Sequence, residues 1–257
     1  MAKRHTQQRR RAIIELLNAQ GEVSVDALAH RFDTSEVTIR KDLAELEQSG
    51  LLLRRYGGAV PMPGEFVAEP EAQATAELTK RKKSLAQAAA ELIQDHNRLI
   101  IDSGSTTAAL LPELSRRQGL VVMTNALDVA NALRELENEP TLLMTGGTWD
   151  ARSESFQGQL AEQVLRAFNF DQLFIGADGL DLQRGTTTFN ELYSLSRVMA
   201  EVAREVVVMA ESDKLGRRIH NLELPWSIVT TLVTDSDCPD SAVQALQQQN
   251  VQVIRAG

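Results

Sequence analysis

The stretch Ser35-Glu-Val-Thr-Ile-Arg-Lys-Asp-Leu43 places hydroxyl groups and cations at the start of a predicted helix. At about 100° per residue, Ile39, Leu43 and Leu46 fall on one side of that helix, which we expect to face a core. Lys41 lies on the opposite side. The pattern therefore predicts a helix that buries one face and offers a polar, cationic face to a partner.

The segments around this helix complete a small domain. Two shorter amphipathic helices are predicted before it, the second capped by Ser24, and the polar break Asp33-Thr34-Ser35 separates them from it. After it, Leu51 to Tyr56 is typical of a strand and Gly57-Gly58 of a tight turn. Helices joined by a short turn and followed by a hairpin indicate a winged helix-turn-helix over residues 1–58.

Such a domain predicts contacts with duplex DNA. A recognition helix enters the major groove with its N-terminal residues against base edges, where Lys41 can reach guanine O6 and N7 and Val37 a thymine methyl. Arg40 and Thr38 are better placed for phosphates. The alternative is a solvated helix in a protein-binding module. The predicted DNA-binding residues are Ser35, Glu36, Val37, Thr38, Arg40, Lys41, Arg54 and Arg55.

Charge is distributed unevenly along the 257 residues. The formal net charge is -8, yet residues 1–60 hold ten Lys and Arg against eight Asp and Glu. A mildly basic N-terminal piece on an acidic body is compatible with a polyanionic partner that touches only that piece. The absence of an apolar run of 18 residues and the single Cys238 predict a cytoplasmic protein with no membrane span and no internal disulfide framework.

Two separated motifs carry a family resemblance. Thr38-Ile-Arg-Lys-Asp-Leu43, followed by Arg55-Tyr-Gly-Gly-Ala59, resembles the signature of the DeoR family of bacterial transcriptional repressors. The resemblance implies operator double-stranded DNA as the partner of the N-terminal domain. Because operators with repeated half-sites are read by paired domains, we also expect a homo-oligomer, a dimer or tetramer.

The rest of the chain predicts an α/β domain over residues 78–257, joined by a proline-containing linker over residues 59–77. Short apolar runs alternate with helix-length segments at 106–117, 126–137, 154–168 and 190–203, which is typical of a parallel sheet covered on both faces. The predicted strands are 99–102, 120–124, 141–145, 172–176, 205–209, 228–233 and 251–254.

Polar and small residues follow these strands, where ligands bind in parallel sheets. Asp102 to Thr107 is a hydroxyl-rich turn into a helix that suits a phosphate group, while Asp102 and Asp178 can accept sugar hydroxyls. Lys214 can pair with phosphate or an acidic neighbour, and residues 186–191 can close over the site. The predicted effector-binding residues are Asp102, Ser103, Gly104, Ser105, Thr106, Thr107, Asn125, Gly146, Gly147, Asp178, Gly179, Glu191 and Lys214.

This part also resembles the DeoR family, whose sensor domain is similar in fold to ribose-5-phosphate isomerase and glucosamine-6-phosphate deaminase. The motifs that fit include Asp102 to Thr107, Gly176-Ala-Asp-Gly179 and Ser212-Asp-Lys214. The resemblance implies a phosphorylated sugar or sugar alcohol as effector. Ser155 to Ala161 and Thr187 to Glu191 look closest to glucitol operon repressors.

An enzyme is the rival interpretation. Asp178, Glu191 and Lys214 are residue types that an aldose–ketose isomerase uses, but Asp178 is followed by Gly179-Leu180 rather than an acidic partner, and a lysine-bearing glycine-rich loop is missing. We therefore expect a sensor and no catalytic residues. A pure interaction protein without a ligand is a second alternative. The four histidines and Cys238 show no metal-ligand spacing, so no metal or cofactor is expected.

Overall fold

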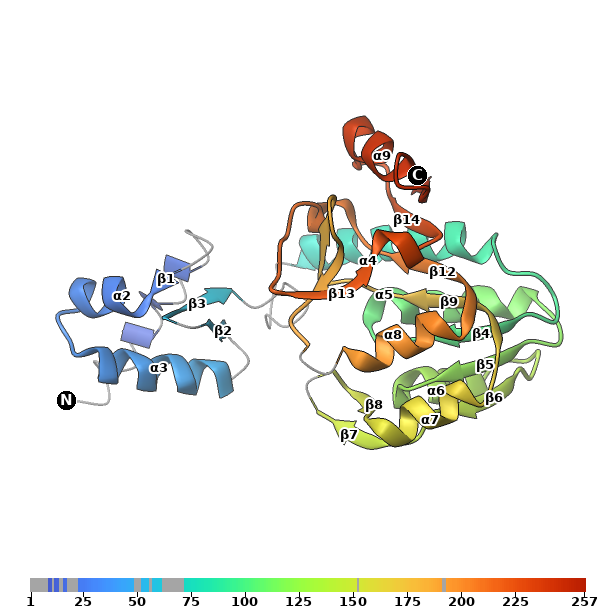
Figure 1. The fold of residues 1–257 in the computed structure, drawn as a ribbon, viewed down its shortest axis with the longest axis horizontal. Coiled ribbons are helices and arrows are strands. Elements are labelled where there is room, and N and C mark those ends of the chain that lie inside the picture. The colour runs from blue at the N-terminus through green and yellow to red at the C-terminus, as the bar shows by residue number, and fades with distance from the viewer. Residues whose placement is uncertain are drawn as a thin grey trace. The chain divides into compact units, whose positions relative to one another are not determined.

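The computed structural model describes residues 9–10, 12–13, 16–17, 23–48, 52–55, 57–61, 72–151, 153–190 and 193–257. The chain divides into two compact units, Met1–Thr75, called here the head, and Ala76–Gly257, called the body (Figure 1). The predicted site residue Glu191 and residues 62–71 of the predicted linker lie outside the described residues.

The head is a winged helix-turn-helix. Helices α2 (Val25–Arg31) and α3 (Glu36–Gln48) precede a hairpin of β2 (Leu52–Arg55) and β3 (Gly58–Pro61), and β1 (Val23–Ser24) pairs antiparallel with β3. Ile39, Leu43 and Leu46 of α3 are at most 5% exposed, as their spacing predicts. They pack in one cluster with residues of the first helix, α2 and the hairpin: Ile13, Leu17, Val23, Val25, Leu28, Leu52 and Ala59.

Asp42 lies beside this core and holds two cations. Its carboxylate oxygens accept hydrogen bonds from Arg9 Nε at 2.6 Å and Arg10 Nε at 2.8 Å, and Arg10 also pairs with Glu45 at 3.0 Å. Asp42 is 2% exposed. It therefore joins the first helical segment to α3 and is not available for DNA, although it stands within the Thr38–Leu43 motif.

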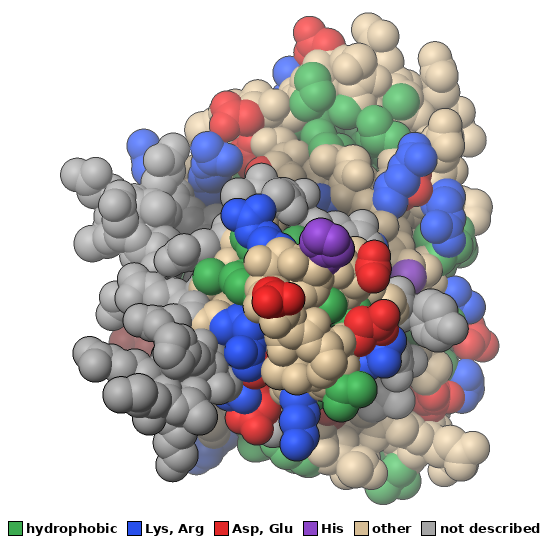
Figure 2. Space-filling model, turned by 90° about the vertical axis from the view of Figure 1, so that its left-hand side faces the viewer, with side chains coloured by type: hydrophobic (Ala, Val, Ile, Leu, Met, Phe, Trp, Pro, Cys, Tyr) green, Lys and Arg blue, Asp and Glu red, His purple; other side chains and the backbone are tan. Residues whose placement is uncertain are grey.

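The remaining charges are mixed in sign. Figure 2 shows Lys and Arg side chains interspersed with Asp and Glu on the face that it draws, with no uninterrupted basic patch among the coloured residues.

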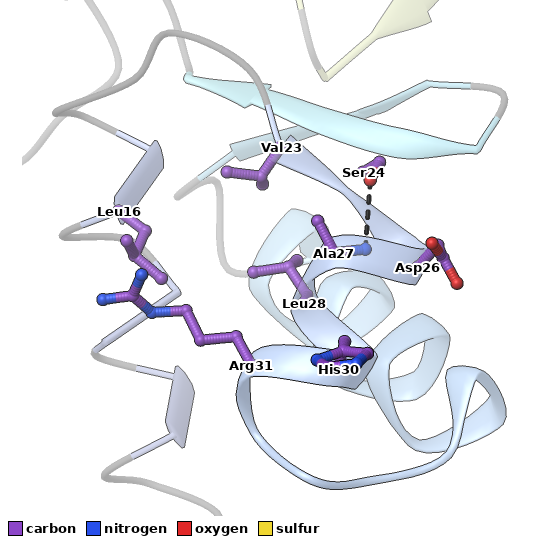
Figure 3. A pocket seen from close by; sticks show the side chains of 8 residues that line it. All are labelled: Leu16, Val23, Ser24, Asp26, Ala27, Leu28, His30 and Arg31. Carbon is purple, nitrogen blue, oxygen red and sulfur yellow. Dashed lines mark hydrogen bonds between the residues drawn. The ribbon is translucent and has the colours of Figure 1, made fainter.

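The start of α2 is capped as its sequence predicts. Ser24 Oγ accepts a hydrogen bond from the backbone N–H of Ala27 at 3.1 Å (Figure 3). The cap lies beside an open hollow of about 620 Å³ between Leu16 and α2, which Arg31 and His30 also line. We assign this hollow no ligand.

The body is built on a seven-stranded parallel sheet, as predicted. Its order is β15-β14-β12-β9-β4-β5-β6. The strands are β4 (Arg98–Ile101), β5 (Val121–Thr124), β6 (Thr141–Met144), β9 (Phe170–Ile175), β12 (Ala203–Met209), β14 (Thr231–Asp235) and β15 (Gln252–Ala256).

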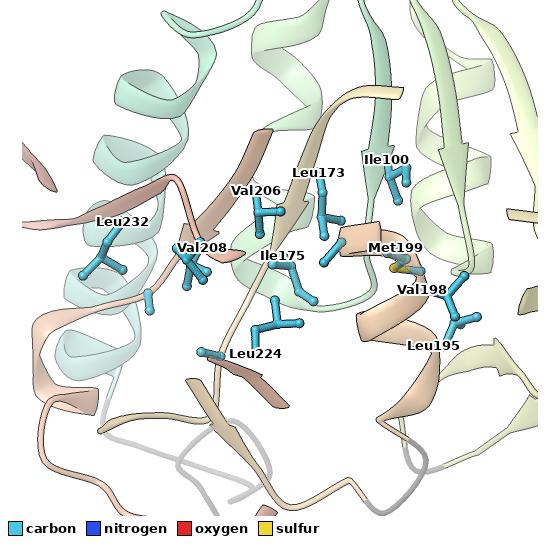
Figure 4. Packing of buried hydrophobic residues seen from close by; sticks show 14 of the residues in the cluster. Ile100, Leu173, Ile175, Leu195, Val198, Met199, Val206, Val208, Leu224 and Leu232 are labelled. Atoms are coloured by element: carbon cyan, nitrogen blue, oxygen red, sulfur yellow. The ribbon is translucent and has the colours of Figure 1, made fainter. Parts of the chain in front are cut away.

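Both faces of this sheet are apolar and covered. Ile100, Leu173 and Val206 point into one cluster with α7 (Gln159–Arg166) and α8 (Ser194–Glu201) (Figure 4). Their chain neighbours Leu99 and Phe174 point to the other cluster. That second cluster includes residues of α4 (Ala72–Ala90) and α6 (Leu127–Arg134). Because side chains alternate between faces, a doubly covered strand is a continuous apolar run.

Several body elements differ from the prediction. A second, antiparallel sheet contains β10 (Gly179–Asp181), β11 (Gly185–Thr188) and β13 (Asn221–Pro225). The segment predicted as a helix over 106–117 is a single turn, α5 (Ser105–Ala108), followed by a 3₁₀ helix at Leu111–Arg116. The segment over 154–168 starts with β8 (Ser155–Gln157), which pairs with β7 (Thr148–Asp150). A last helix, α9 (Asp240–Gln247), precedes β15.

The predicted linker over 59–77 is too long at both ends. Residues 59–61 belong to β3, which pairs with β2, and residues 72–77 belong to α4. A four-residue wing strand and a polar helix start carry little periodic apolar signal, so the sequence does not predict either as a regular element. Among the described residues, none of the helices combines the length and apolar character needed to cross a membrane.

Candidate DNA-binding surface and effector site

The solvent side of α3 carries the predicted DNA-reading residues. Val37 is 69% exposed, and Arg40 and Lys41 are also exposed. Ser35 caps the helix, because its Oγ accepts from the Thr38 N–H at 3.3 Å and lies 2.9 Å from Thr38 Oγ1. An exposed β-branched residue beside a cation at a capped helix start is suited to contact base edges.

Ion pairs and hydrogen bonds hold other predicted residues on α3 and on the adjoining strand. Arg40 pairs with Glu36 one turn earlier at 2.5 Å. In β2, the Arg54 N–H donates to Glu47 Oε1 at 3.0 Å and its guanidinium lies 3.9 Å from Glu47 Oε2, which ties the wing to the end of α3. Arg55 is half-buried. All eight predicted residues therefore belong to α3, its cap or the adjoining wing strand.

In the body, the loop after β4 is braced from the neighbouring strand. Asn125 follows β5 and is fully buried. Its Nδ2 donates to Asp102 Oδ1 at 2.8 Å, while its Oδ1 accepts from the Ser103 N–H at 3.1 Å. The prediction that Asp102, Ser103 and Asn125 meet at the carboxyl edge of the sheet is therefore confirmed by their hydrogen bonds.

Two residues of this loop that the sequence predicts to bind the effector are buried. Thr107 is fully buried, and its Oγ1 lies 2.8 Å from the carbonyl oxygens of both Asp102 and Gly104, to which it donates. Thr106 is 3% exposed. The expectation that these hydroxyls donate to an anion is wrong for Thr107, since its proton is used within the loop. Because α5 is one turn long, a helix dipole contributes little positive potential at this loop.

A second part of the edge is acidic. Asp178 follows β9 and accepts from Thr188 Oγ1 at 2.8 Å and the Phe189 N–H at 3.1 Å. Glu223 in β13 is 7% exposed and accepts from Ser196 Oγ at 2.8 Å and Thr186 Oγ1 at 3.3 Å. Threonines of β11 therefore link both carboxylates.

Burial and the charges of neighbouring carboxylates favour the neutral forms of Glu223 and Asp102. Burial raises the pKa of Glu223 to about 8, and the charges of Asp102 and Asp178 act in the same direction. Burial likewise raises the pKa of Asp102 to about 6, against the hydrogen bonds from Asn125 and Ser103. These mutual effects place Asp102, Asp178 and Glu223 within electrostatic range of one another.

Lys214 is the predicted cation of this edge. It is 8% exposed, and its Nζ lies 3.2 Å from Glu211 Oε2, both residues following β12. The adjacent Ser212 is fixed by Asp235 at the end of β14, which accepts from the Ser212 N–H at 2.8 Å and from its Oγ at 2.5 Å. Lys214 therefore forms a buried ion pair with Glu211, on a turn that the hydrogen bonds from Ser212 to Asp235 hold in place.

Two of the predicted glycines are needed for packing. A Cβ on Gly147 would lie 2.5 Å from the Gln157 carbonyl oxygen, and one on Gly179 would lie 2.4 Å from the Arg217 carbonyl oxygen. Gly146 has no neighbour within 4 Å of such a Cβ, but its φ is +62°. Gly147 and Gly179 are therefore needed for close backbone packing, and their effector-binding roles stay predictions, whereas the space beside Gly146 is open.

The segment predicted to close over the site is also corrected. Residues 186–188 lie in β11, are at most 5% exposed and pair on both sides with β10 and β13. A strand paired on both edges does not move as a lid. The predicted role of Glu191 concerns a residue outside the described ranges.

Two charged residues of this edge were missed from the sequence. Glu223 stands between leucines in a strand that was not predicted. Lys82 in α4 is 9% exposed, and its Nζ donates to Ser105 Oγ at 2.6 Å. Lys82 shares the helical spacing of the apolar residues that follow it, which was an available signal.

The described residues show no group of three or more His, Cys, Asp or Glu placed to hold a metal ion. Cys238 is buried, and burial raises the pKa of its thiol. A second open hollow, of about 430 Å³, lies between α8 and β13 and is lined by Arg197, Ala200, Glu201, Leu222, Pro225 and Ile228.

A winged helix-turn-helix head followed by a parallel-sheet body with a polar edge defines a ligand-sensing transcription regulator. Two family models match the chain: a DeoR-like helix-turn-helix domain over residues 9–62 and the DeoR C terminal sensor domain over residues 77–236. The chain therefore belongs to the DeoR family.

Curated relatives agree over almost the whole chain. The putative aga operon transcriptional repressor of Escherichia coli O157:H7 is 40% identical over 255 residues, covering 98% of this chain and 94% of the relative. The glycerol-3-phosphate regulon repressor of Escherichia coli K12 is 31% identical over 247 residues, covering 96% and 97%. Among solved structures, ribose 5-phosphate isomerase A of Methanocaldococcus jannaschii matches with a TM-score of 0.39 and 18% identity, over 53% of this chain and 54% of that chain.

Proposed function

We propose that this chain represses a sugar or sugar-alcohol catabolic operon in the cytoplasm and is released from its operator by a phosphorylated sugar. The observation that carries the proposed operator binding is the exposed face of α3, with Val37 and Lys41 beside a capped helix start. Relatives named as repressors of an aga operon and a glycerol-3-phosphate regulon support the sugar context. The glucitol subfamily stays a prediction.

The head supplies base and backbone contacts. Lys41 and Val37 read base edges, while Arg40, Thr38 and the N–H groups of the helix start contact phosphates. Arg54 on the wing adds a contact to the phosphate backbone of DNA. Its strand is held against α3 by the hydrogen bond from the Arg54 N–H to Glu47. Two heads are needed for repeated half-sites, so the bodies are proposed to form a homo-oligomer.

The carboxyl edge of the sheet is proposed as the effector site. Its chemistry has two parts that match a phosphosugar. The carboxyl groups of Asp102, Asp178 and Glu223 can form hydrogen bonds with sugar hydroxyls, and backbone N–H groups of the loop after β4 with nearby lysines can bind the phosphate. Binding releases DNA only if the effector has different affinities for two arrangements of the protein.

The head assignment is tested by paired substitutions. An operator sequence is selected from random duplexes with the purified chain, and single-base variants of it are compared. Lys41→Ala should cost about 1–3 kcal/mol on the matched sequence and relax preference at one position, because a bidentate base contact is lost. Arg54→Ala should weaken binding to all variants alike. Identical behaviour of the two variants would refute the recognition-helix assignment.

Catalysis by the body is the second candidate. The acidic groups near Asp102 resemble a proton-transfer site in residue type, but the curated relatives are named as transcriptional regulators, which supports the sensor. Turnover of pentose or hexose phosphates by the purified chain, abolished in Asp178→Asn, would favour the enzyme instead.

A further inference from the structure

The outer face of α8 borders the open groove between this helix and β13. The inward face of α8 packs in the body core, where Leu195, Val198 and Met199 are at most 3% exposed (Figure 4). Its outer face carries Arg197 and Glu201, one turn apart, and both are exposed and line the groove. The helix therefore has one face in the core and one charged face turned to solvent.

The rest of the groove lining is apolar. Ala200, Leu222, Pro225 and Ile228 complete it, and Ile228 is 40% exposed. A polar metabolite would find few hydrogen-bonding groups on this lining. An exposed apolar surface with charged residues at its rim is instead typical of a contact between proteins.

Arg197 is exposed but held in place. Its Nε donates to the carbonyl oxygen of Glu223 at 3.2 Å and its Nη2 to that of Leu222 at 2.9 Å. Its guanidinium carbon lies 4.8 Å from the centroid of the Tyr193 ring. A side chain that is already ordered loses little entropy on binding, and arginine is enriched among the residues that dominate binding at interfaces.

The two charges favour a second copy of this chain as the partner. A two-fold contact uses the same surface patch twice, so the patch must be complementary to itself. When α8 of one copy lies antiparallel to α8 of the other, Arg197 of each copy faces Glu201 of the other, and the small side chain of Ala200 allows a close approach. The side chain of Glu201 is 63% exposed, and its ion pair with Arg166 is long, at 3.7 Å.

We propose that the groove between α8 and β13 is the two-fold interface through which two bodies pair. Arg197 and Glu201 form two equivalent ion pairs across it, beside an apolar contact made by Ile228. The inference rests on the proposed function, which needs paired heads.

The position of the groove suits a protein that must sense an effector. Ser196 Oγ donates to the Glu223 carboxylate at 2.8 Å, while the next residue, Arg197, holds the Glu223 carbonyl oxygen. Strand β13 therefore borders both the proposed interface and the proposed effector site. An effector that shifts Glu223 can change the contact between the two bodies.

The charge test is sedimentation analysis of the full chain over a range of concentrations, with circular dichroism to confirm folding. Arg197→Glu and Glu201→Arg should each weaken self-association at least 10-fold, because each places like charges opposite one another across the two-fold axis. An equimolar mixture of the two variants should associate again, since one partner then presents two acidic groups and the other two basic groups.

The apolar contact is tested without a change of charge. Ile228→Asn should weaken self-association at least 10-fold, because it places a polar side chain in the apolar contact. Leu160→Asn is the matched control: Leu160 is 59% exposed on α7 and does not line the groove, so this variant should associate like the wild type.

The outcomes separate the interface from the proposed function. Weaker association of Ile228→Asn and of both charge variants, restored in the mixture, supports the interface. Wild-type association of Ile228→Asn and Arg197→Glu overturns it, and the proposed function still stands when the chain binds operator DNA and is released by a sugar phosphate. Charge variants that stay dissociated when mixed overturn the two-fold pairing. A wild-type chain that is monomeric at every concentration overturns the interface and the proposed homo-oligomer together.

Discussion

At the scale of single residues, the motif Thr38–Leu43 combines two different tasks. Lys41 is exposed, whereas Asp42 next to it is buried and holds Arg9 and Arg10. Sequence spacing identified the face of α3 but not the inward role of Asp42, because the partners lie 32 and 33 residues away. A motif residue can therefore matter for DNA binding without touching DNA.

Asp42→Ala should destabilise the head by about 2 kcal/mol, because it removes the shared partner of two partly buried arginines. Urea unfolding of the full chain, followed by the loss of DNA binding, measures the change. Glu45→Ala is the matched control: its side chain is 60% exposed, so its pair with Arg10 should contribute less than about 1 kcal/mol. Equal effects of the two substitutions would contradict the anchoring role.

Glu223 makes stability depend on pH. Its pKa is raised from 4.5 to about 8 in the folded chain, so the folded state binds more protons than the unfolded state between these values. The contribution of Glu223 is therefore present at low pH and is lost as pH rises through about 8. Glu223→Gln should stabilise the chain relative to the wild type by on the order of 2 kcal/mol at pH 9 and by much less at pH 5.

Urea unfolding of both proteins across pH 5–9 tests this sign. The narrower window of Asp102, from 3.8 to about 6, lies mostly below that range and is common to both proteins. A difference in stability that shrinks as pH rises would show that Glu223 is ionised in the folded chain.

At the scale of elements, the sequence predicted the parallel sheet well and the edge of the site poorly. Doubly covered strands such as β4 and β12 are continuous apolar runs, which are visible without a structure. Strand β11, Gly-Thr-Thr-Thr, has no apolar residue, and its burial arises from pairing with β10 and β13. Its threonines serve as partners for Asp178 and Glu223 rather than as core, so periodicity gave no signal.

The hairpin β7–β8 and the glycines before it provide an element-scale prediction. Gly147→Ala should destabilise the body by about 2–4 kcal/mol, because its φ is +113° and the new Cβ would lie 2.5 Å from the Gln157 carbonyl oxygen. Gly146→Ala should cost about 1 kcal/mol, since only its backbone conformation is unfavourable. Thermal unfolding measures both. A costlier Gly146→Ala would contradict the packing role given to Gly147.

At the scale of the whole molecule, one chain combines a DeoR-like helix-turn-helix head with a DeoR C terminal sensor domain. The family assignment rests on matches to both domains and on relatives aligned over nearly the full chain. The sequence predicted this architecture because two motifs and one strand–helix alternation suffice for it. The identity of the effector could not be predicted from the sequence, because side chains from α4, β11 and β13 come together at the edge of the sheet only after folding.

The most direct test is fluorescence anisotropy of the purified chain on DNA from upstream of its own gene, titrated with sugar and hexitol phosphates. The account predicts tight binding that weakens steeply with salt and is released by one phosphate but not by its unphosphorylated parent. DNA binding that no phosphorylated compound alters would contradict the sensor, and absence of DNA binding would contradict the repressor.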